Sequence, residues 1–146
     1  MYPYQYKVSL RCKHPSADPD EITKALGIQP DGIQKVGQPR TTPVGTPLTG
    51  LYKRTYWHAY LSGNKPQNSE EAEFETCLFQ IAEQLEPSKD VIRAFVESGG
   101  EATLSVGLFC PQNSGMEFPW KLITRLASLR VGLLLDYYPG DPDSTS

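Results

Sequence analysis

Apolar and polar residues alternate along three stretches of the chain, over residues 4–13, 52–61 and 101–110. A period of two is typical of β-strands that bury one face and expose the other. In the first stretch the even-numbered residues are apolar and the odd-numbered residues are all polar or charged. A shorter stretch, Leu133–Tyr138, predicts a fourth strand near the end of the chain.

The segment after the first strand predicts a short helix. Asp18 is a favourable N-cap, and Pro19 suits the first helical position. Glu21 stands three residues after Asp18, as in a capping box, and Gly27 provides a C-terminal stop. We therefore expect a helix over residues 19–26.

Apolar residues recur at helical spacing in two more regions. We expect one helix to begin at Asn68 or Ser69 and to carry four glutamates in its first turns, which suits the positive end of the helix dipole. Pro87 should break this helix into two segments. The last helix is predicted to begin near Pro119, with Gly132 marking its end.

The order of these elements indicates the fold class. Because alternating strands are half-exposed, they argue against a parallel sheet that helices cover on both faces. We expect an α+β two-layer sandwich, with a mainly antiparallel or mixed four-stranded sheet, helices packed on one face and ferredoxin-like layering. Residues 1–139 should form a single domain, and residues 140–146 a flexible tail.

The longest segment without a regular pattern runs from residue 28 to residue 50. Its second part, the Gly37–Gly50 loop, is rich in Pro, Gly and Thr, which disfavours a helix. Long loops in small domains are usually functional or disordered. This loop leads directly into the most aromatic strand, and three side chains near the junction can bind an anion: Arg40, Arg54 and His58.

The predicted sheet has one face that no helix covers. Aromatic and arginine residues are enriched in the cores of protein interfaces, and this face contains both. The alternative interpretation is that Tyr and Thr favour strands and tolerate solvent. The candidate binding residues on this face are Arg11, Tyr56, His58, Tyr60, Asp136 and Tyr138.

Composition narrows the class of partner. The chain of 146 residues has a net charge of −3, which gives no general reason to expect nucleic acid. Charged residues are unevenly distributed along the chain. Nine Lys/Arg and four Asp/Glu lie up to Lys65, and five Lys/Arg and thirteen Asp/Glu follow it.

The sequence also indicates where the protein is located. No apolar run approaches the roughly 20 residues of a membrane span, and the first residues lack the apolar region of a secretion signal. We expect a cytoplasmic protein that binds neither membranes nor nucleic acid.

Candidate chemistry is sparse. Three cysteines without a CxxC pair indicate reduced, mostly buried thiols rather than a disulfide framework, and core packing is favoured over a Cys–His nucleophile. The scattered Cys and His residues do not supply three or four metal ligands, and no cofactor is expected. The constellation that fits acid–base work is His58 beside Tyr56 and Tyr60, with Asp136 as a candidate carboxylate.

Several short motifs occur in order along the chain: Tyr6–Arg11, His14-Pro15-Ser16, Asp18–Ile28, Gly37-Gln38-Pro39-Arg40, Gly45–Leu48, Tyr56-Trp57, Ser98-Gly99-Gly100 and Leu135–Pro139. With them the chain resembles the bacterial family called domain of unknown function 4279, from about Tyr4 to Pro139. Members often carry a Trp before the Gly-x-Pro-Arg motif, where this chain has Gln34-Lys35-Val36. The resemblance implies a small bacterial cytoplasmic protein without an established activity. Small α+β proteins also serve as immunity proteins to bacterial toxins, which is an analogy of fold.

Two functions from different classes follow from the sequence. The preferred one is a non-enzymatic protein-binding domain that uses the open sheet face and the Gly37–Gly50 loop, with another copy of itself or a bacterial protein as partner. The alternative is an enzyme or small-ligand-binding protein that holds an anionic ligand with Arg40, Arg54 and His58. A cleft around Arg40 and His58 favours the alternative, and a flat or self-paired face favours protein binding.

Overall fold

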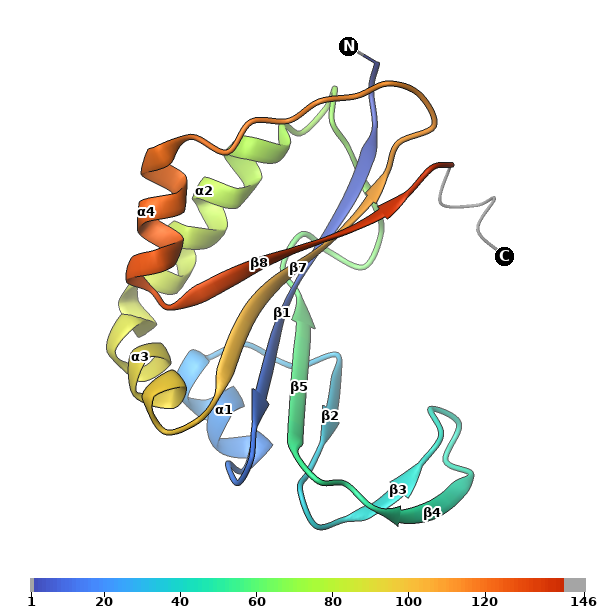
Figure 1. The fold of residues 1–146 in the computed structure, drawn as a ribbon, viewed down its shortest axis with the longest axis vertical. Coiled ribbons are helices and arrows are strands. Elements are labelled where there is room, and N and C mark those ends of the chain that lie inside the picture. The colour runs from blue at the N-terminus through green and yellow to red at the C-terminus, as the bar shows by residue number, and fades with distance from the viewer. Residues whose placement is uncertain (1, 141–146) are drawn as a thin grey trace.

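A computed structural model describes residues 2–140 and shows two layers, a twisted sheet and a set of helices on one of its faces (Figure 1). The main sheet has the order β2-β5-β1-β7-β8, and β6 pairs with the start of β1. All neighbours are antiparallel except β7 and β8, which are parallel. Its strands are β1 (Gln5–His14), β2 (Gly32–Gln34), β5 (Thr55–Tyr60), β6 (Gln67–Asn68), β7 (Glu101–Phe109) and β8 (Val131–Tyr138).

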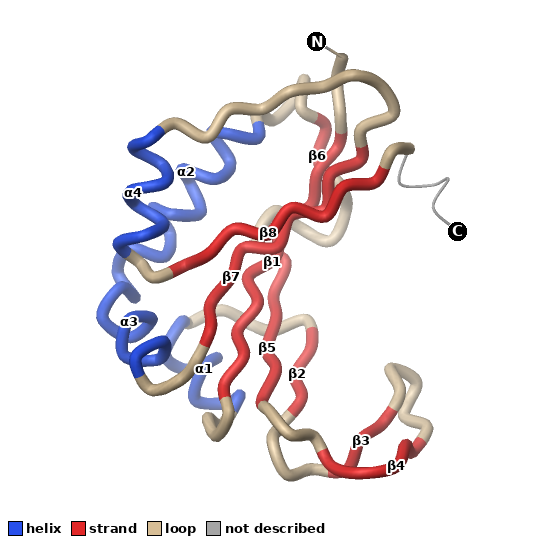
Figure 2. Tube along the Cα trace, viewed as in Figure 1, coloured by secondary structure: helices blue, strands red, loops and turns tan. Residues whose placement is uncertain are grey.

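The helix layer covers the face that carries the apolar residues of the alternating strands (Figure 2). Trp57 of β5 is fully buried there, and its indole Nε1 donates a 2.9 Å hydrogen bond to the Thr23 hydroxyl. The layer contains α1 (Pro19–Leu26), α2 (Phe74–Leu85), the short 3-10 helix η1 (Glu86–Ser88), α3 (Lys89–Glu97) and α4 (Trp120–Ser128).

The α+β fold expected from the alternation is confirmed. The four predicted strands are adjacent in the sheet as β5, β1, β7 and β8, and β8 is at one edge. The sheet is wider than the expected four strands because β2 and β6 add to it, and both are too short to show a period of two. Of the expected tail, residues 141–146 lie outside the described residues.

The first helix has the predicted boundaries. The Asp18 carboxylate accepts a 3.0 Å hydrogen bond from the Asp20 backbone N–H. Gly27 ends the helix in the left-handed conformation, with φ of 68°, and its N–H donates to the Thr23 carbonyl. Local capping chemistry therefore determined this element.

The predicted start of the second helix is wrong. α2 begins at Phe74, about one turn later than expected, and the segment before it forms a turn. Asn68 pairs with Gln5 in β6, and its side chain accepts from the Glu70 N–H within that turn. The residue expected to cap a helix is thus used by a strand and a turn. The break at Pro87 is confirmed, because η1 separates α2 from α3.

The segment expected to be an irregular loop contains three strands. Besides β2, it forms a hairpin of β3 (Pro39–Thr41) and β4 (Pro47–Leu51), which we call the arm. The arm projects from the end of the sheet that carries β2 and β5 (Figure 2). Its turn is closed by a 2.8 Å bond from the Thr42 N–H to the Thr46 carbonyl, with Gly45 at φ of 89°. All residues of β3 and β4 are exposed, so no buried face produces a period of two.

Candidate functional site

The face of the sheet opposite the helices carries most of the predicted binding residues. The β1–β5 register places Arg11 opposite His58, Lys13 opposite Tyr56, and Ser9 opposite Tyr60. Because side chains alternate along strands, these residues all lie on the open face. Sequence reasoning therefore grouped Arg11, Tyr56, His58 and Tyr60 correctly, and the pairing of β1 with β5 brings them together.

Cationic side chains of β1 rest against tyrosine rings of β5. The Lys7 Nζ lies 4.0 Å from the centroid of the Tyr60 ring, and the Lys13 Nζ lies 5.2 Å from that of Tyr56. Arg11 stands between these two lysines along the strand, and its Nε donates a 3.4 Å hydrogen bond to the Ser9 hydroxyl. Cation–π contacts hold the charges in place while leaving them accessible to a partner. The centre of the open face is therefore a row of three positive charges.

His58 lies over a glycine of the neighbouring strand. Gly32 is its register partner in β2, and a Cβ at position 32 would overlap the His58 ring. The ring also contacts Tyr60 edge-on, at 5.8 Å between centroids. Partial burial lowers the pKa of His58 below its ordinary value and the Arg11 guanidinium lowers it further, while the Asp31 carboxylate acts in the opposite direction. His58 is therefore biased towards the neutral imidazole.

Asp31 was missed by the sequence reasoning, because it lies in the segment that was expected to be an irregular loop. Its carboxylate accepts a 2.7 Å hydrogen bond from the Tyr60 N–H, and its own N–H donates a 2.8 Å bond to the His58 carbonyl. These two bonds tie the residue before β2 to the edge of β5. The Asp31-Gly32 pair, which is typical of turns, was the available signal.

A cleft of about 410 Å³ separates the arm from the open face. On the sheet side it is lined by Asp31, Gln34, Tyr56 and His58, and on the arm side by Thr41, Thr42, Pro43 and Tyr52. The Tyr52 hydroxyl donates a 3.1 Å hydrogen bond to the Thr41 carbonyl and accepts one of the same length from the Thr41 N–H. These two bonds tie Tyr52 to Thr41 and so stabilise the arm side of the cleft.

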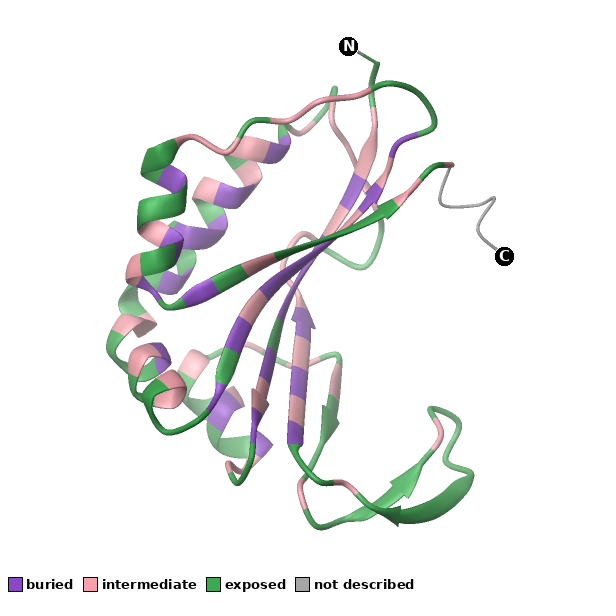
Figure 3. Cartoon of the chain, in the orientation of Figure 1, coloured by how far each residue is buried: buried purple, intermediate pink, exposed green. Residues whose placement is uncertain are grey.

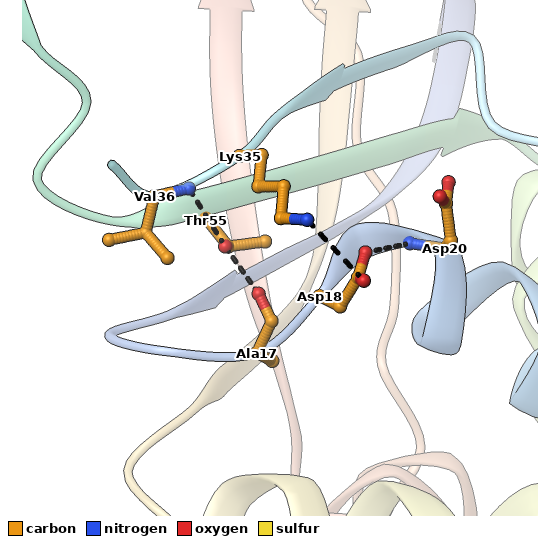
Figure 4. A network of polar contacts seen from close by, with 6 residues as sticks. All are labelled: Ala17, Asp18, Asp20, Lys35, Val36 and Thr55. Carbon is orange, nitrogen blue, oxygen red and sulfur yellow. Dashed lines mark hydrogen bonds and ion pairs between the residues drawn. The ribbon is translucent and has the colours of Figure 1, made fainter. Parts of the chain in front are cut away.

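A buried threonine fixes the base of the arm (Figure 4). The Thr55 hydroxyl donates to the Ala17 carbonyl and accepts a 3.2 Å bond from the Val36 N–H. Nearby, the Lys35 Nζ lies 3.6 Å from the Asp18 carboxylate. Thr55 is the first residue of β5, and its hydroxyl links this strand to the loop before α1 and to the connection between β2 and β3. The arm therefore leaves the sheet from an anchored position.

The three residues of the alternative anion site do not meet. Arg40 lies on β3, where its Nη1 donates a 3.0 Å bond to the Thr49 carbonyl, and it lines a separate hollow with Lys53. Arg54 is exposed just before β5. Neither arginine lines the cleft that contains His58.

The last two candidate residues lie apart from His58. Asp136 and Tyr138 are on β8, three strands from β5. Asp136 is in register with Lys7 of β1 and not with Arg11, the partner of His58, so it lies more than about 14 Å from His58 at the usual strand spacing. The Tyr138 hydroxyl donates a 2.8 Å hydrogen bond to the Asp136 carboxylate, which raises the pKa of Tyr138. The Tyr138 ring stacks on Phe109 at 5.0 Å and 12°. This pair forms a second polar and aromatic patch on the same face.

The remaining chemistry-bearing side chains have structural roles. All three cysteines are free thiols, and burial raises the pKa of Cys12 to about 12, which makes it a poor nucleophile. His14 is buried, and its Nδ1 accepts hydrogen bonds from the Ser16 and Ala17 N–H groups.

Within residues 2–140, no three His, Cys, Asp or Glu side chains gather closely enough to hold a metal ion. No helix in this range has the length and apolar character to cross a membrane.

The fold and the open face define a class, a two-layer α+β protein with one uncovered sheet face that carries aromatic rings, a row of cations and carboxylates near that row. The chain matches the model of the family described as Domain of unknown function (DUF4279) over residues 4–140, and it belongs to this family. The resemblance inferred from its short motifs is thereby confirmed. No curated protein and no solved structure matches the chain.

Proposed function

We propose that this chain is a non-enzymatic protein-binding domain of the bacterial cytoplasm that binds an acidic surface of a partner protein. The observation that carries this proposal is the row of three cations on β1, with tyrosines beside its lysines, on a sheet face that helices leave open. Free thiols fit a reducing compartment. The family membership supports a bacterial source.

The chemistry of the face suits binding more than catalysis. Arginine and tyrosine are the residues on which binding energy concentrates at protein interfaces, and clusters of cations speed encounter with acidic partners. The two lysines are held by ring contacts, so less side-chain entropy is lost on binding. A partner that presents Asp or Glu side chains to Lys7, Arg11 and Lys13 would complement the row.

The arm extends the proposed surface. It exposes apolar side chains at its turn and along β4, namely Val44 at 88%, Leu51 at 56% and Leu48 at 43%. Exposed apolar groups in a neighbourhood of polar residues mark interaction sites. The cleft between arm and sheet can receive a side chain or turn of the partner, with Asp31 and His58 on its sheet side.

The alternative, binding of a small anionic ligand, has less support. It requires Arg40, Arg54 and His58 around one site, whereas the cleft at His58 contains the carboxylate of Asp31 and neither arginine. An acidic group beside the imidazole disfavours an anion at that position.

The test is capture of partners from the source bacterium with the wild type and with an Arg11→Glu/Tyr56→Glu variant. A matched control, Lys24→Glu/Ala94→Glu, makes the same charge change at exposed positions of the helix layer. We expect a partner that is retained by the wild type and the control and lost by the open-face variant, with binding that weakens as salt rises. A partner that binds the open-face variant equally well would refute the proposal.

A further inference from the structure

Exposed large apolar side chains gather in a second place, far from the arm. Within the described residues, five of them lie on α4 and β8, with exposed fractions from 44% to 71%. The two elements that carry these five side chains follow each other in the chain and lie on the side of the molecule where the sheet ends at β8 (Figure 3). They are Trp120, Ile123, Leu134, Leu135 and Tyr137.

β8 is a long edge strand. It runs over eight residues and, among residues 2–140, pairs only with β7, so its outer edge presents backbone N–H and C=O groups without strand partners in that range. Natural edges are usually guarded by lysine, proline, a bulge or a short strand. The opposite edge, β2, has only three residues. β8 contains no lysine or proline, and its one charged residue, Asp136, is engaged by the Tyr138 hydroxyl.

α4, the helix beside this edge, also has an exposed face. α4 contacts α2 and β8. Trp120, Ile123 and Ala127 are exposed and follow one another at the spacing of a single helical stripe. A partner that continues the sheet beyond β8 in the same plane would place its own helix layer next to α4 and cover part of this stripe.

We propose that two copies of this chain pair through their β8 strands, antiparallel and across a two-fold axis, to form one continuous sheet. The sequence of β8 is self-complementary in a register centred on Leu134. Leu133 then lies opposite Leu135 of the second copy and Val131 opposite Tyr137, while Gly132 lies opposite Asp136. Cross-strand apolar pairs stabilise such a ladder, and a register centred on Asp136 is excluded because it sets two carboxylates face to face.

This interface is independent of the proposed function. It uses the edge of the sheet, and it leaves the cation row of each copy free, since that row lies on β1 two strands away. The dimer would present two open faces on one side of a single sheet, which allows bivalent binding.

The test measures the solution mass by light scattering over a range of concentrations. We expect the mass of two chains for the wild type and of one chain for Leu134→Lys, which places two lysines opposite each other. The matched control is Leu48→Lys on the arm, where Leu48 is similarly exposed, and it should remain a dimer. Circular dichroism and thermal melting show whether each variant is folded.

A cross-linking variant tests the register directly. Residue 134 lies opposite its own copy, at a Cα separation of about 4.5–5.5 Å for antiparallel partners, which a disulfide can span. Leu134→Cys should therefore form a covalent dimer under mild oxidation, while Leu48→Cys and the wild type should not. A wild type that is monomeric at every concentration overturns the proposal. A dimer that survives Leu134→Lys but is lost in Arg11→Glu/Tyr56→Glu also overturns it, and places self-association on the open face.

Discussion

The imidazole of His58 occupies the space that a side chain at position 32 would need, so Gly32 is the residue that lets the His58 ring lie against β2. We predict that Gly32→Ala turns the half-exposed ring away from β2 and lowers the free energy of unfolding by about 1 kcal/mol, the low end of the usual cost of overpacking, because the clashing atoms are at the free end of a side chain that can rotate. Denaturant unfolding measures the change. Gly132→Ala is the control, because a Cβ there finds its nearest neighbours at 3.8 Å and 3.9 Å. Equal effects of the two substitutions would contradict this account of Gly32.

The pKa of His58 should respond in opposite directions to its two charged neighbours. Arg11→Gln removes a cation that lowers the pKa of His58, so the pKa should rise. Asp31→Asn removes a carboxylate that raises it, so the pKa should fall. NMR titration of the ring protons measures both shifts, and His14, the other histidine of the chain, serves as the internal reference. Shifts of the same sign in both variants would show that structural change, not charge, controls the titration.

Stability should depend on pH through the same residue. The pKa of His58 in the folded protein lies below its ordinary value of 6.5, so the unfolded chain takes up a proton first as the pH falls. The contribution of His58 to stability is complete above about 6.5 and decreases between 6.5 and the folded-state pKa. Denaturant midpoints of the wild type and of His58→Gln at several pH values measure this contribution. The difference between the two proteins should change across that interval and level off on either side.

Thr55 should be important for stability although it lies at the entry to the arm. Thr55→Val keeps the shape of the side chain and leaves the Val36 N–H and the Ala17 carbonyl without their partner. We predict a loss of about 1–3 kcal/mol in the free energy of unfolding, the usual cost of an unsatisfied buried group. The control is Thr103→Val on β7, because Thr103 is only half-buried and its hydroxyl can bond to water. A Thr55→Val protein as stable as this control would rule out the proposed anchor.

Tyr52→Phe should loosen the arm without affecting the fold. The substitution removes both hydrogen bonds between the Tyr52 hydroxyl and Thr41. Amide hydrogen exchange of Thr41 should become faster, while the midpoint of global unfolding stays unchanged, because the arm adds little to the core. Tyr137→Phe on β8 provides a control with an exposed ring. Unchanged exchange at Thr41 would show that the backbone ladder alone holds the arm.

The sequence by itself determined the elements whose signals are local. Burial of one face makes residues alternate, so β1, β5 and β7 are visible as periods of two. The Asp18 cap and the Gly27 stop bounded α1 because capping depends on side chains a few residues apart. The same alternation placed Arg11, Tyr56, His58 and Tyr60 on the face opposite the core, since successive side chains of a strand point to opposite sides.

The tertiary structure decided what depends on contacts between distant segments. The three strands within residues 28–51 are short or wholly exposed, and so lack a periodic signal. Asn68, a good helix cap in isolation, became part of β6 because Gln5, far away in sequence, offered a backbone partner. Strand order separated Asp136 from His58 and brought Asp31 beside it instead. Sheet order and the path of the arm are settled by long-range backbone pairing, which no local pattern of residues encodes.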